Sequence, residues 1–391
     1  MSPKYIFFLD FDGTITTADV GYEMFKKFTD GRTQTIVDEY RKGEVNSYAC
    51  LNTECDIWNE SPPNEKEVID FIEMQGISKG FKNFCDLLQE NGIKSYVVSE
   101  GFEFYIDRIL DYNGLSNLAK ITNMAVFSKG IITPEFPYRG KGCGECSNCK
   151  GYHIKRLMNL RSSAVFIGDG HSDIHGAAAA DIIFAKSFLR ESLDYAGRYY
   201  FQYVDFFDII KEWSELHARD YFCGSDRIAL CGVNEKRRGN FESLWELPEV
   251  MTNVGYPNGL GWSSRKYDQF WRNLRKRDFI LFAIEDNRGK FLGEAKLAFP
   301  DSDKNCCHDV KLLPEFQGRG IEREAWRLLL EMTERRWQNF AVTVTPGIDN
   351  TAAINLYKSL GFEFEGKAEM WTPPPNSRGA ERVEFIKMVK R

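Results

Sequence analysis

The sequence contains no long apolar run and no block of basic residues. Without such a run, the 391-residue chain offers neither the apolar core of a signal peptide nor a candidate membrane span. Its formal net charge of −6 and its lack of a repeated aromatic platform argue against nucleic acid as a partner, because phosphates require a basic surface. We therefore expect a cytoplasmic protein that binds neither membranes nor nucleic acid.

The other bulk properties indicate more than one globular domain. Hydrophobic residues make up 43% and charged residues 28% of the sequence, as in folded proteins. A chain of 391 residues exceeds one ordinary domain, so we expect two. Ten cysteines in a reducing compartment are expected to be thiols or metal ligands rather than disulfides.

The first chemical motif is a pair of carboxylates that follows an apolar run. Asp10 directly follows Phe7–Leu9, and Asp12 lies two residues later, before a Gly13-Thr14 turn. Because alternate residues of a strand share a face, the two carboxylates can converge on one reacting atom. Two carboxylates with this spacing and no other motif in the chain more often form a surface turn. Here, however, apolar runs also end in polar residues at two later places in the chain.

These two places, and a lysine between them, complete an ordered set of polar residues. In chain order the set is Asp10, Asp12, Ser99, Lys150, Asp169 and Asp173. The order resembles the four motifs of the haloacid dehalogenase (HAD) superfamily of phosphotransferases. The resemblance implies a Rossmann-like α/β domain over residues 1–215, with a small helical cap at about residues 17–90 like that of the phosphoserine phosphatase branch. In such a parallel sheet, ligands gather beyond the carboxyl ends of the strands.

The resemblance also implies a role for each residue. Asp10 would be the nucleophile that forms an aspartyl-phosphate, and Asp12 would protonate the leaving alcohol and later activate water. Ser99 would bind phosphoryl oxygens, and Lys150 would neutralise the charge that develops there. Because dehalogenases need no acid to protonate an alkoxide, the presence of Asp12 favours a phosphatase.

The same resemblance implies a metal ion. Carboxylates beside a phosphate are useful only when a cation neutralises them, and Mg²⁺ prefers oxygen ligands. The implied ligands are a carboxylate oxygen of Asp10, the backbone carbonyl of Asp12, and Asp169. Asp173 lies one helical turn after Asp169, so we expect it to support these metal ligands or to hold Lys150.

Two positions of this site have more than one interpretation. Lys141 and Lys155 compete with Lys150, although the helix predicted directly after Lys150 fits the family pattern best. Asp19, nine residues after Asp10, is either an acidic contact to substrate or the N-cap of the first cap helix.

A cysteine-rich loop precedes the lysine. Cys143, Cys146 and Cys149 have the spacing of zinc ligands, and His153 could complete a Cys3His set. A single short loop would then supply all four ligands, whereas structural zinc sites generally draw on two segments. The loop also resembles one in the enol-phosphate phosphatase of methionine salvage, and oxidation-sensitive thiols are a third alternative.

Two histidines flank the last motif. His171 and His175 share one helical face because they are four residues apart. Since Asp169 and Asp173 already account for this segment, we expect no second metal there.

The polar segment 217–220 leads into an expected linker near residue 220, and the pattern changes from Arg227 onward. A strand at 228–233 and two helical stretches up to residue 277 precede two strands, 279–284 and 290–299, which we expect to pair as a hairpin. The segment 310–321 is then predicted to be a strand that runs into a Gly-rich turn and the start of a helix. The first N–H groups of such a helix attract anions such as a pyrophosphate.

That turn, together with Asn350 and Tyr357 about thirty residues on, resembles the GNAT acyltransferase family. The resemblance covers roughly residues 226–391 and implies an α+β domain. Asn350 would lie beside the pantetheine arm of acetyl-CoA, and Tyr357 would protonate the thiolate of CoA. The pyrophosphate would be held by the turn residues Gln317, Gly318, Arg319, Gly320 and Ile321.

One residue departs from the GNAT pattern. Glu322 occupies a position where the family has a small residue, and a carboxylate there repels a pyrophosphate. The second half is therefore either an acetyl-CoA-dependent N-acetyltransferase or a non-catalytic module for ligand binding or dimerisation.

The sequence thus predicts a Mg²⁺-dependent phosphatase fused to an N-acetyltransferase. The phosphatase substrate should be a small phosphorylated metabolite, because a cap that closes over the site excludes large molecules. A further alternative is phosphoryl transfer to an acceptor other than water.

Overall fold

A seven-stranded sheet forms the centre of the N-terminal half of the protein. The computed structural model describes residues 4–366, 369–371 and 383–391, in two units, Lys4–Glu215 and Leu216–Arg391. The sheet of the first unit has the order β4-β3-β2-β1-β5-β6-β7, and only the β3–β4 pair is antiparallel. Its strands are β1 (Lys4–Leu9), β2 (Lys94–Phe102), β3 (Lys120–Ser128), β4 (Ile131–Glu135), β5 (Ser162–Gly168), β6 (Ile182–Ala185) and β7 (Phe201–Gln202).

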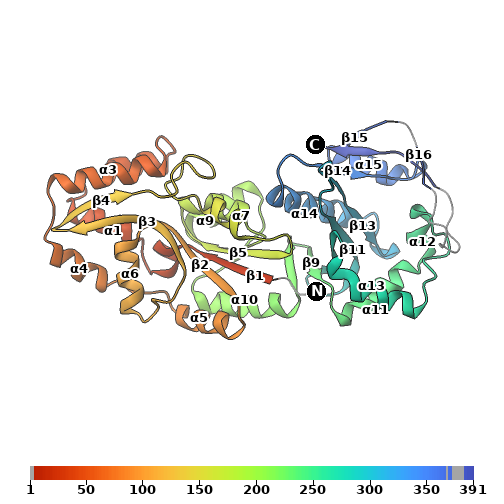
Figure 1. The fold of residues 1–391 in the computed structure, drawn as a ribbon, viewed down its shortest axis with the longest axis horizontal. Helices are drawn as coiled ribbons and strands as arrows, with labels where there is room; N and C mark the ends of the chain where they lie inside the picture. The colour runs from red at the N-terminus through yellow and green to blue at the C-terminus, as the bar shows by residue number, and fades with distance from the viewer. Residues whose placement is uncertain (1–3, 367–368, 372–382) are drawn as a thin grey trace. The chain divides into compact units, whose positions relative to one another are not determined.

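Helices cover both faces of this sheet (Figure 1). On one face, the ring of Phe7 contacts Phe84 at 5.3 Å and Trp213 at 4.8 Å. On the other face, Phe8 shares a core with Leu189. Because both faces of β1 are buried, its sequence is a continuous apolar run. The first face carries α5 (Phe81–Glu90) and α10 (Phe206–Ala218), and the second carries α7 (Lys150–Leu157), α8 (Ile174–Ala179) and α9 (Ser187–Ala196).

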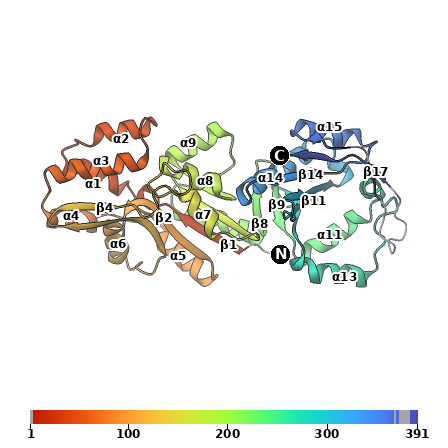
Figure 2. The same cartoon turned by 45° about the horizontal axis from the view of Figure 1, so that its top comes forward.

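Four helices between β1 and α5 form the cap. They are α1 (Val20–Phe28), α2 (Gln34–Arg41), α3 (Ser47–Glu60) and α4 (Glu65–Glu73), and Figure 2 shows the first three side by side. Asp19, Asn46 and Asn64 cap the N-termini of α1, α3 and α4. The indole of Trp58 donates to the carbonyl of Gly130 at 2.7 Å and so fixes α3 to the β3–β4 hairpin.

The C-terminal unit contains two larger sheets. One has five antiparallel strands in the order β13-β11-β10-β9-β8, and the other has the order β12-β14-β18-β15. The five strands are β8 (Tyr221–Gly224), β9 (Ile228–Gly232), β10 (Phe279–Asp286), β11 (Phe291–Ala298) and β13 (Asp309–Leu312). The four are β12 (Asn305–Cys307), β14 (Ala341–Val344), β15 (Glu363–Phe364) and β18 (Met388–Lys390), and β16 (Glu369–Trp371) pairs with β17 (Val383–Phe385).

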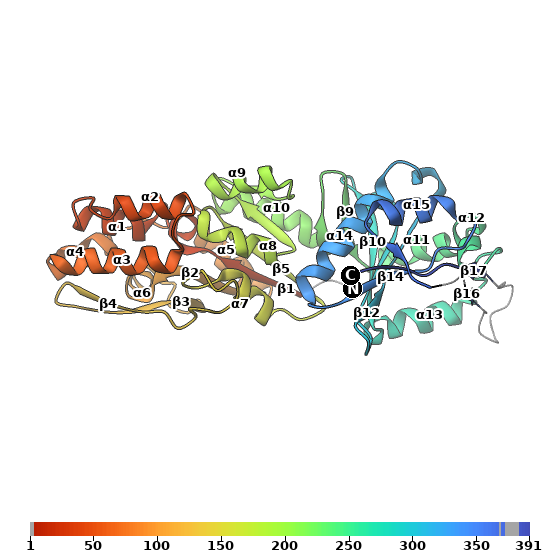
Figure 3. The same cartoon turned by 90° about the horizontal axis from the view of Figure 1, so that it is seen from above.

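Two sets of helices pack on the five-stranded sheet. The core on one face includes Trp326 of α14 (Ile321–Arg336) and Tyr357 of α15 (Thr351–Ser359). Figure 3 shows helix α14. Phe241 and Trp245 of α11 (Glu235–Trp245) belong to the core on the other, with α12 (Pro248–Met251) and α13 (Ser264–Asn273).

The expected fold class is confirmed, as is the hairpin of β10 and β11. The structure differs from expectation at Tyr221–Gly224, a segment expected to belong to a linker, which forms the edge strand β8. The guanidinium of Arg237 fixes the start of this strand by binding Asp220 at 3.4 Å and Glu285 at 2.6 Å. In the described part of the chain, the helices are too short or too polar to cross a membrane.

Candidate active sites

The first site lies where β1 and β5 end. Asp10 directly follows β1 and Asp169 directly follows β5, its parallel neighbour, so both carboxyls reach the same edge of the sheet. Lys150 begins α7, and its Nζ lies 2.6 Å from Oδ1 of Asp10 and 2.5 Å from Oδ1 of Asp173. These three side chains are buried. The structure brings Lys150 to Asp10, whereas Lys141 and Lys155 are exposed.

Asp173 holds the end of β5 in place. Its Oδ2 accepts hydrogen bonds from the backbone N–H groups of Asp169 at 2.7 Å and Gly170 at 2.9 Å. With Oδ1 on Lys150, both carboxylate oxygens of Asp173 are engaged. Asp173 therefore has the contacts of a supporting residue.

A glycine and a threonine position Asp169. The hydroxyl of Thr14 donates to Oδ1 of Asp169 at 2.6 Å. Gly13 has φ +77°, and a Cβ atom on it would lie 2.5 Å from Oδ2 of Asp169. Only glycine permits both this backbone conformation and this approach.

Asp12 has hydrogen-bond partners different from those of Lys150. Its Oδ2 accepts from the hydroxyl of Tyr105 at 2.7 Å, and its Oδ1 accepts from the N–H of Gly21 at 3.1 Å. Burial, followed by repulsion from Asp19, raises the pKa of Asp12 to about 7. A carboxyl with a pKa near neutrality can both give and take a proton at physiological pH.

Ser99 lies where β2 bends. The register between β2 and β3 shifts between Val98 and Phe102, and the N–H of Gly101 donates to Oγ of Ser99 at 2.9 Å. The carbonyl of Ser99 accepts from Asn148 at 2.8 Å, which fixes the bend against the loop before α7.

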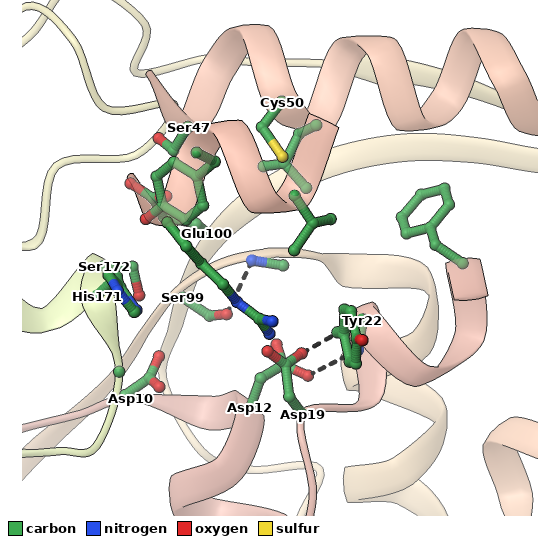
Figure 4. Close-up of a pocket in the computed structure, with 18 of the residues that line it drawn as sticks. Asp10, Asp12, Asp19, Tyr22, Ser47, Cys50, Ser99, Glu100, His171 and Ser172 are labelled. Carbon is green, nitrogen blue, oxygen red and sulfur yellow. Dashed lines mark hydrogen bonds between the residues drawn. The ribbon is translucent and has the colours of Figure 1, made fainter. Parts of the chain in front are cut away.

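Of these residues, Asp10, Asp12, Ser99 and Asp169 line a cavity of about 420 Å³ beneath the cap. Figure 4 shows Asp10, Asp12 and Ser99 pointing into it. The carboxyl-bearing residues of its wall are Asp10, Asp12, Asp19, Glu54, Glu100 and Asp169, against one guanidinium, that of Arg41. A phosphate cannot enter such a cavity favourably unless a cation offsets the carboxylates.

Oxygen ligands for a cation are present. Carboxylate oxygens of Asp10, Asp169 and Asp173 lie within 4.8 Å of one another. Since Asp173 already binds Lys150 and two N–H groups, Asp10 and Asp169 are the better ligands. Burial, and then repulsion from Asp173, raises the pKa of Asp10 well above its usual value and that of Asp169 to about 6. An adjacent cation would favour their ionised forms.

Asp19 is the N-cap of α1, one of the two interpretations made from the sequence, and the acidic contact to substrate stays a prediction. Its carboxylate accepts from the N–H of Tyr22 at 2.9 Å as the N-cap of α1, and it also lines the cavity.

Tyr105 and Glu100 also contribute to the site, although neither was predicted from the sequence. Glu100 directly follows Ser99, but the motif assigns no role to it. Tyr105 lies outside the motifs and reaches Asp12 only through the packing of α6 (Glu103–Tyr112).

The cysteine loop has a partner that the sequence did not suggest. His153, which could have completed a Cys3His set, has other partners: its Nε2 lies 2.5 Å from Oδ1 of Asn148, and its Nδ1 accepts from Arg156 at 3.0 Å. Instead, Nδ1 of His175 lies 3.3 Å from Sγ of Cys146.

The C-terminal unit has a cavity of about 330 Å³ lined by residues of β13, β14 and α15. Of the residues expected to bind acetyl-CoA, Gln317, Gly318, Asn350 and Tyr357 line it. The other three do not belong to its wall. Ile321 is buried in the core, Gly320 caps α14 with φ +78°, and the Arg319 guanidinium lies 5.8 Å from the ring of Phe316.

Glu322 and Tyr357 both face this cavity. Burial, followed by repulsion from Asp309, raises the pKa of Glu322 to about 7, so its carboxyl is neutral over part of the physiological range. Burial also raises the pKa of Tyr357 above its usual value, which keeps the hydroxyl protonated. The Tyr357 ring packs edge-on against Trp326 at 5.3 Å.

A smaller aromatic cavity of about 250 Å³ shares three wall residues with the previous one: Lys296, Asp309 and Lys311. Its wall includes Trp245, Trp262, Phe270 and Glu294. The shared residues make the two cavities neighbours within the same unit.

Comparison with known proteins shows which families the two parts of the chain match. Residues 7–178 match the haloacid dehalogenase-like hydrolase family. A Bacillus cereus 2-hydroxy-3-keto-5-methylthiopentenyl-1-phosphate phosphatase is 30% identical over 214 residues, which cover 54% of this chain and 95% of that protein. The chain belongs to the haloacid dehalogenase-like hydrolases. Residues 241–362 of this hydrolase match the acetyltransferase (GNAT) family, so it carries a HAD phosphatase domain and a GNAT domain, as the sequence predicts.

Other known proteins are similar to parts of the chain. The bifunctional enzyme MtnB/MtnX of Bacillus licheniformis is 29% identical over 246 residues, and the match spans 56% of each chain. A substrate-bound phosphoserine phosphatase structure covers 54% of the hydrolase and 99% of its own chain, with 22% identity and a TM-score of 0.43. A Vibrio cholerae spermidine N-acetyltransferase in complex with CoA and spermine covers 42% of the hydrolase and 94% of its own chain, with 18% identity and a TM-score of 0.35.

Proposed function

We propose that the N-terminal unit hydrolyses a small phosphomonoester through a covalent aspartyl-phosphate. The observation that carries the proposal is the contact of Lys150 with both Asp10 and Asp173, next to a separately held Asp12. A buried lysine between two carboxylates keeps its charge, since burial opposes that charge but Asp10 and Asp173 raise its pKa above the usual value.

Each step uses a residue of the cavity. An oxygen of Asp10 attacks phosphorus, and the ester P–O bond breaks as Asp12 gives its proton to the departing alkoxide. Ser99 and Lys150 bind the phosphoryl oxygens. Asp12, now ionised, takes a proton from water, and the hydroxide attacks phosphorus to release inorganic phosphate and the free carboxylate of Asp10.

The carboxylate-rich wall fits a magnesium ion. Asp10 and Asp169 would hold it, together with the backbone carbonyl of Asp12. When bound, Mg²⁺ supplies positive charge that offsets the phosphate and the carboxylates. Asp173 would act on the site by holding Lys150 and the backbone of Asp169.

The cap favours a substrate with an apolar portion. Phe25, Val37 and Leu51 line the cavity from α1, α2 and α3. A methylthio group suits these three side chains better than the ammonium and carboxylate of phosphoserine. We therefore assign as substrate the compound in the relatives' names, 2-hydroxy-3-keto-5-methylthiopentenyl-1-phosphate, and a cytoplasmic location remains a prediction.

A phosphate-release assay tests this proposal. With Mg²⁺ we expect kcat/KM for the methylthio ester to exceed that for phosphoserine by on the order of 100-fold, because phosphoserine has no apolar group to place against Phe25, Val37 and Leu51. Excess EDTA should abolish the release, and added Mg²⁺ should restore it. Equal rates for the two esters would contradict the substrate assignment, and ester consumption without free phosphate would indicate a phosphotransferase.

For the C-terminal unit we propose transfer of an acetyl group from acetyl-CoA to an amine. Acetyl-CoA would occupy the cavity between Gln317 and Tyr357, with Asn350 beside its pantetheine arm and the hydroxyl of Tyr357 giving a proton to the thiolate. The neighbouring aromatic cavity would hold the acceptor, since the indole rings of Trp245 and Trp262 suit the apolar body of an amine. The alternative is a non-catalytic module, which the carboxyl of Glu322 favours.

Glu322 gives that cavity a predictable pH dependence. Its pKa of about 7 means that the carboxyl is neutral below this pH and anionic above it, where it repels a pyrophosphate. We expect acetyl-CoA affinity, measured by calorimetry, to weaken as the pH rises through 7. In Glu322→Gln this part of the dependence should disappear, and binding above pH 7 should be about tenfold tighter.

Exposed Glu315 offers a matched control, because Glu315→Gln removes the same charge from the surface. Asp309 also faces Glu322 and stays ionised across this pH range, since burial opposes its charge but Lys311 and Lys296 hold its pKa below the usual value. Tyr357→Phe should bind acetyl-CoA but lose turnover with amines. Undetectable binding in both the wild type and Glu322→Gln would eliminate acetyl-CoA and leave the non-catalytic module.

A further inference from the structure

The cysteine loop and helix α8 meet outside the phosphatase cavity. A metal-binding atom from each of Cys143, Cys146, Cys149 and His175 lies within 4.8 Å of the others. Tetrahedral zinc, with bonds of about 2.3 Å to sulfur and about 2.0 Å to nitrogen, requires its ligand atoms to be about 3.5–3.8 Å apart. The separation of 3.3 Å between Cys146 Sγ and His175 Nδ1 is close to this requirement.

We propose that Cys143, Cys146, Cys149 and His175 bind one structural zinc ion. Three thiolates and an imidazole form a common closed zinc site, whereas Mg²⁺ prefers oxygen. The ligands come from two segments, the loop before α7 and helix α8. The objection that a single short loop supplies every ligand therefore does not apply, and the expectation of no metal at His175 is revised.

The backbone is shaped for this arrangement. Gly142 has φ +70°, and a Cβ atom on it would lie 2.8 Å from Sγ of Cys149, so a larger residue would displace the thiol. Gly151 lets α7 approach α8, because a Cβ atom there would lie 2.5 Å from the carbonyl oxygen of His175. The N–H of Cys146 also lies 3.4 Å from Sγ of Cys143, where it stabilises a thiolate.

The ion would join the two segments that carry the phosphatase lysine and its partner. Cys149 immediately precedes Lys150, and His175 lies two residues after Asp173. Lys150 and Asp173 form the 2.5 Å ion pair of the first site. Zinc is therefore a positioning element for that pair and takes no part in the proposed chemistry, so its presence can be tested independently of the phosphatase activity.

Metal analysis of the full chain, without a histidine tag, tests the proposal. After dialysis against metal-free reducing buffer, we expect about one zinc ion per chain by mass spectrometry. His175→Ala and Cys143→Ser, both at exposed positions, should lose most of this zinc while remaining folded by circular dichroism. His217→Ala and Cys85→Ser, which remove the same side chains outside the cluster, should retain it.

Cobalt substitution provides a second readout that does not depend on activity. The cobalt-loaded wild type should show the visible bands of tetrahedral thiolate coordination, and His175→Ala should shift or lose them. A wild-type protein that neither contains zinc nor takes up cobalt when reduced overturns the proposal. Full zinc retention in His175→Ala overturns the four-ligand assignment.

Discussion

Asp10→Asn should reduce phosphate release by on the order of 10⁴-fold or more, the largest loss expected of any single substitution. The amide has nearly the shape of the carboxylate, but it lacks the anionic oxygen that attacks phosphorus. It also removes one of the two carboxylates that contact Lys150, while Asp173 remains. The loss should appear in kcat, measured by release of inorganic phosphate at saturating Mg²⁺.

The covalent step gives this prediction a second measurement. Rapid acid quenching of the wild type during turnover should trap protein that is heavier by one phosphoryl group, and Asp10→Asn should trap none. Asp86→Asn, at an exposed position of α5, is the matched control and should behave as the wild type. Trapped phosphate in Asp10→Asn would assign the nucleophile to another residue, provided that intact mass excludes deamidation back to Asp.

The residues that could be predicted from sequence are those that adjoin a strong local pattern. Asp10 and Asp169 each directly follow a buried strand, so an apolar run marks them and the parallel sheet brings them together. Lys150 was predictable from its order in the chain and from the helix that begins there. Its contacts with Asp10 and Asp173 require the tertiary structure.

The residues that were missed depend on packing between elements. Tyr105 reaches Asp12 from α6, and no periodicity in the sequence marks a tyrosine that points across to another motif. Nothing in the sequence links His175 to the cysteine loop, because helical spacing relates it only to His171 on its own helix. The strand β8 was missed because four residues carry too little alternation to distinguish a strand from a linker.

Asp12→Asn should lower kcat for alkyl phosphates by on the order of 10²- to 10⁴-fold, since the alkoxide would leave without a proton. For p-nitrophenyl phosphate the loss in the first step should be much smaller, because nitrophenolate is a stable leaving group. The same variant lacks the base for the second step, so phosphorylated protein should accumulate with the aryl ester. The prediction is checked by comparing burst amplitude and kcat for the two esters.

Tyr105→Phe separates the acid from the group that positions it. The phenol donates to Oδ2 of Asp12 at 2.7 Å. Without this hydrogen bond, the Asp12 carboxyl keeps its contact with the N–H of Gly21 at 3.1 Å. Because the acid itself remains, we expect a smaller fall in kcat than for Asp12→Asn, again larger for the alkyl ester. Equal losses for alkyl and aryl esters in Asp12→Asn would mean that Asp12 does not transfer a proton to the leaving group. Its hydrogen bonds to Tyr105 and Gly21 would then serve only to hold the turn after β1.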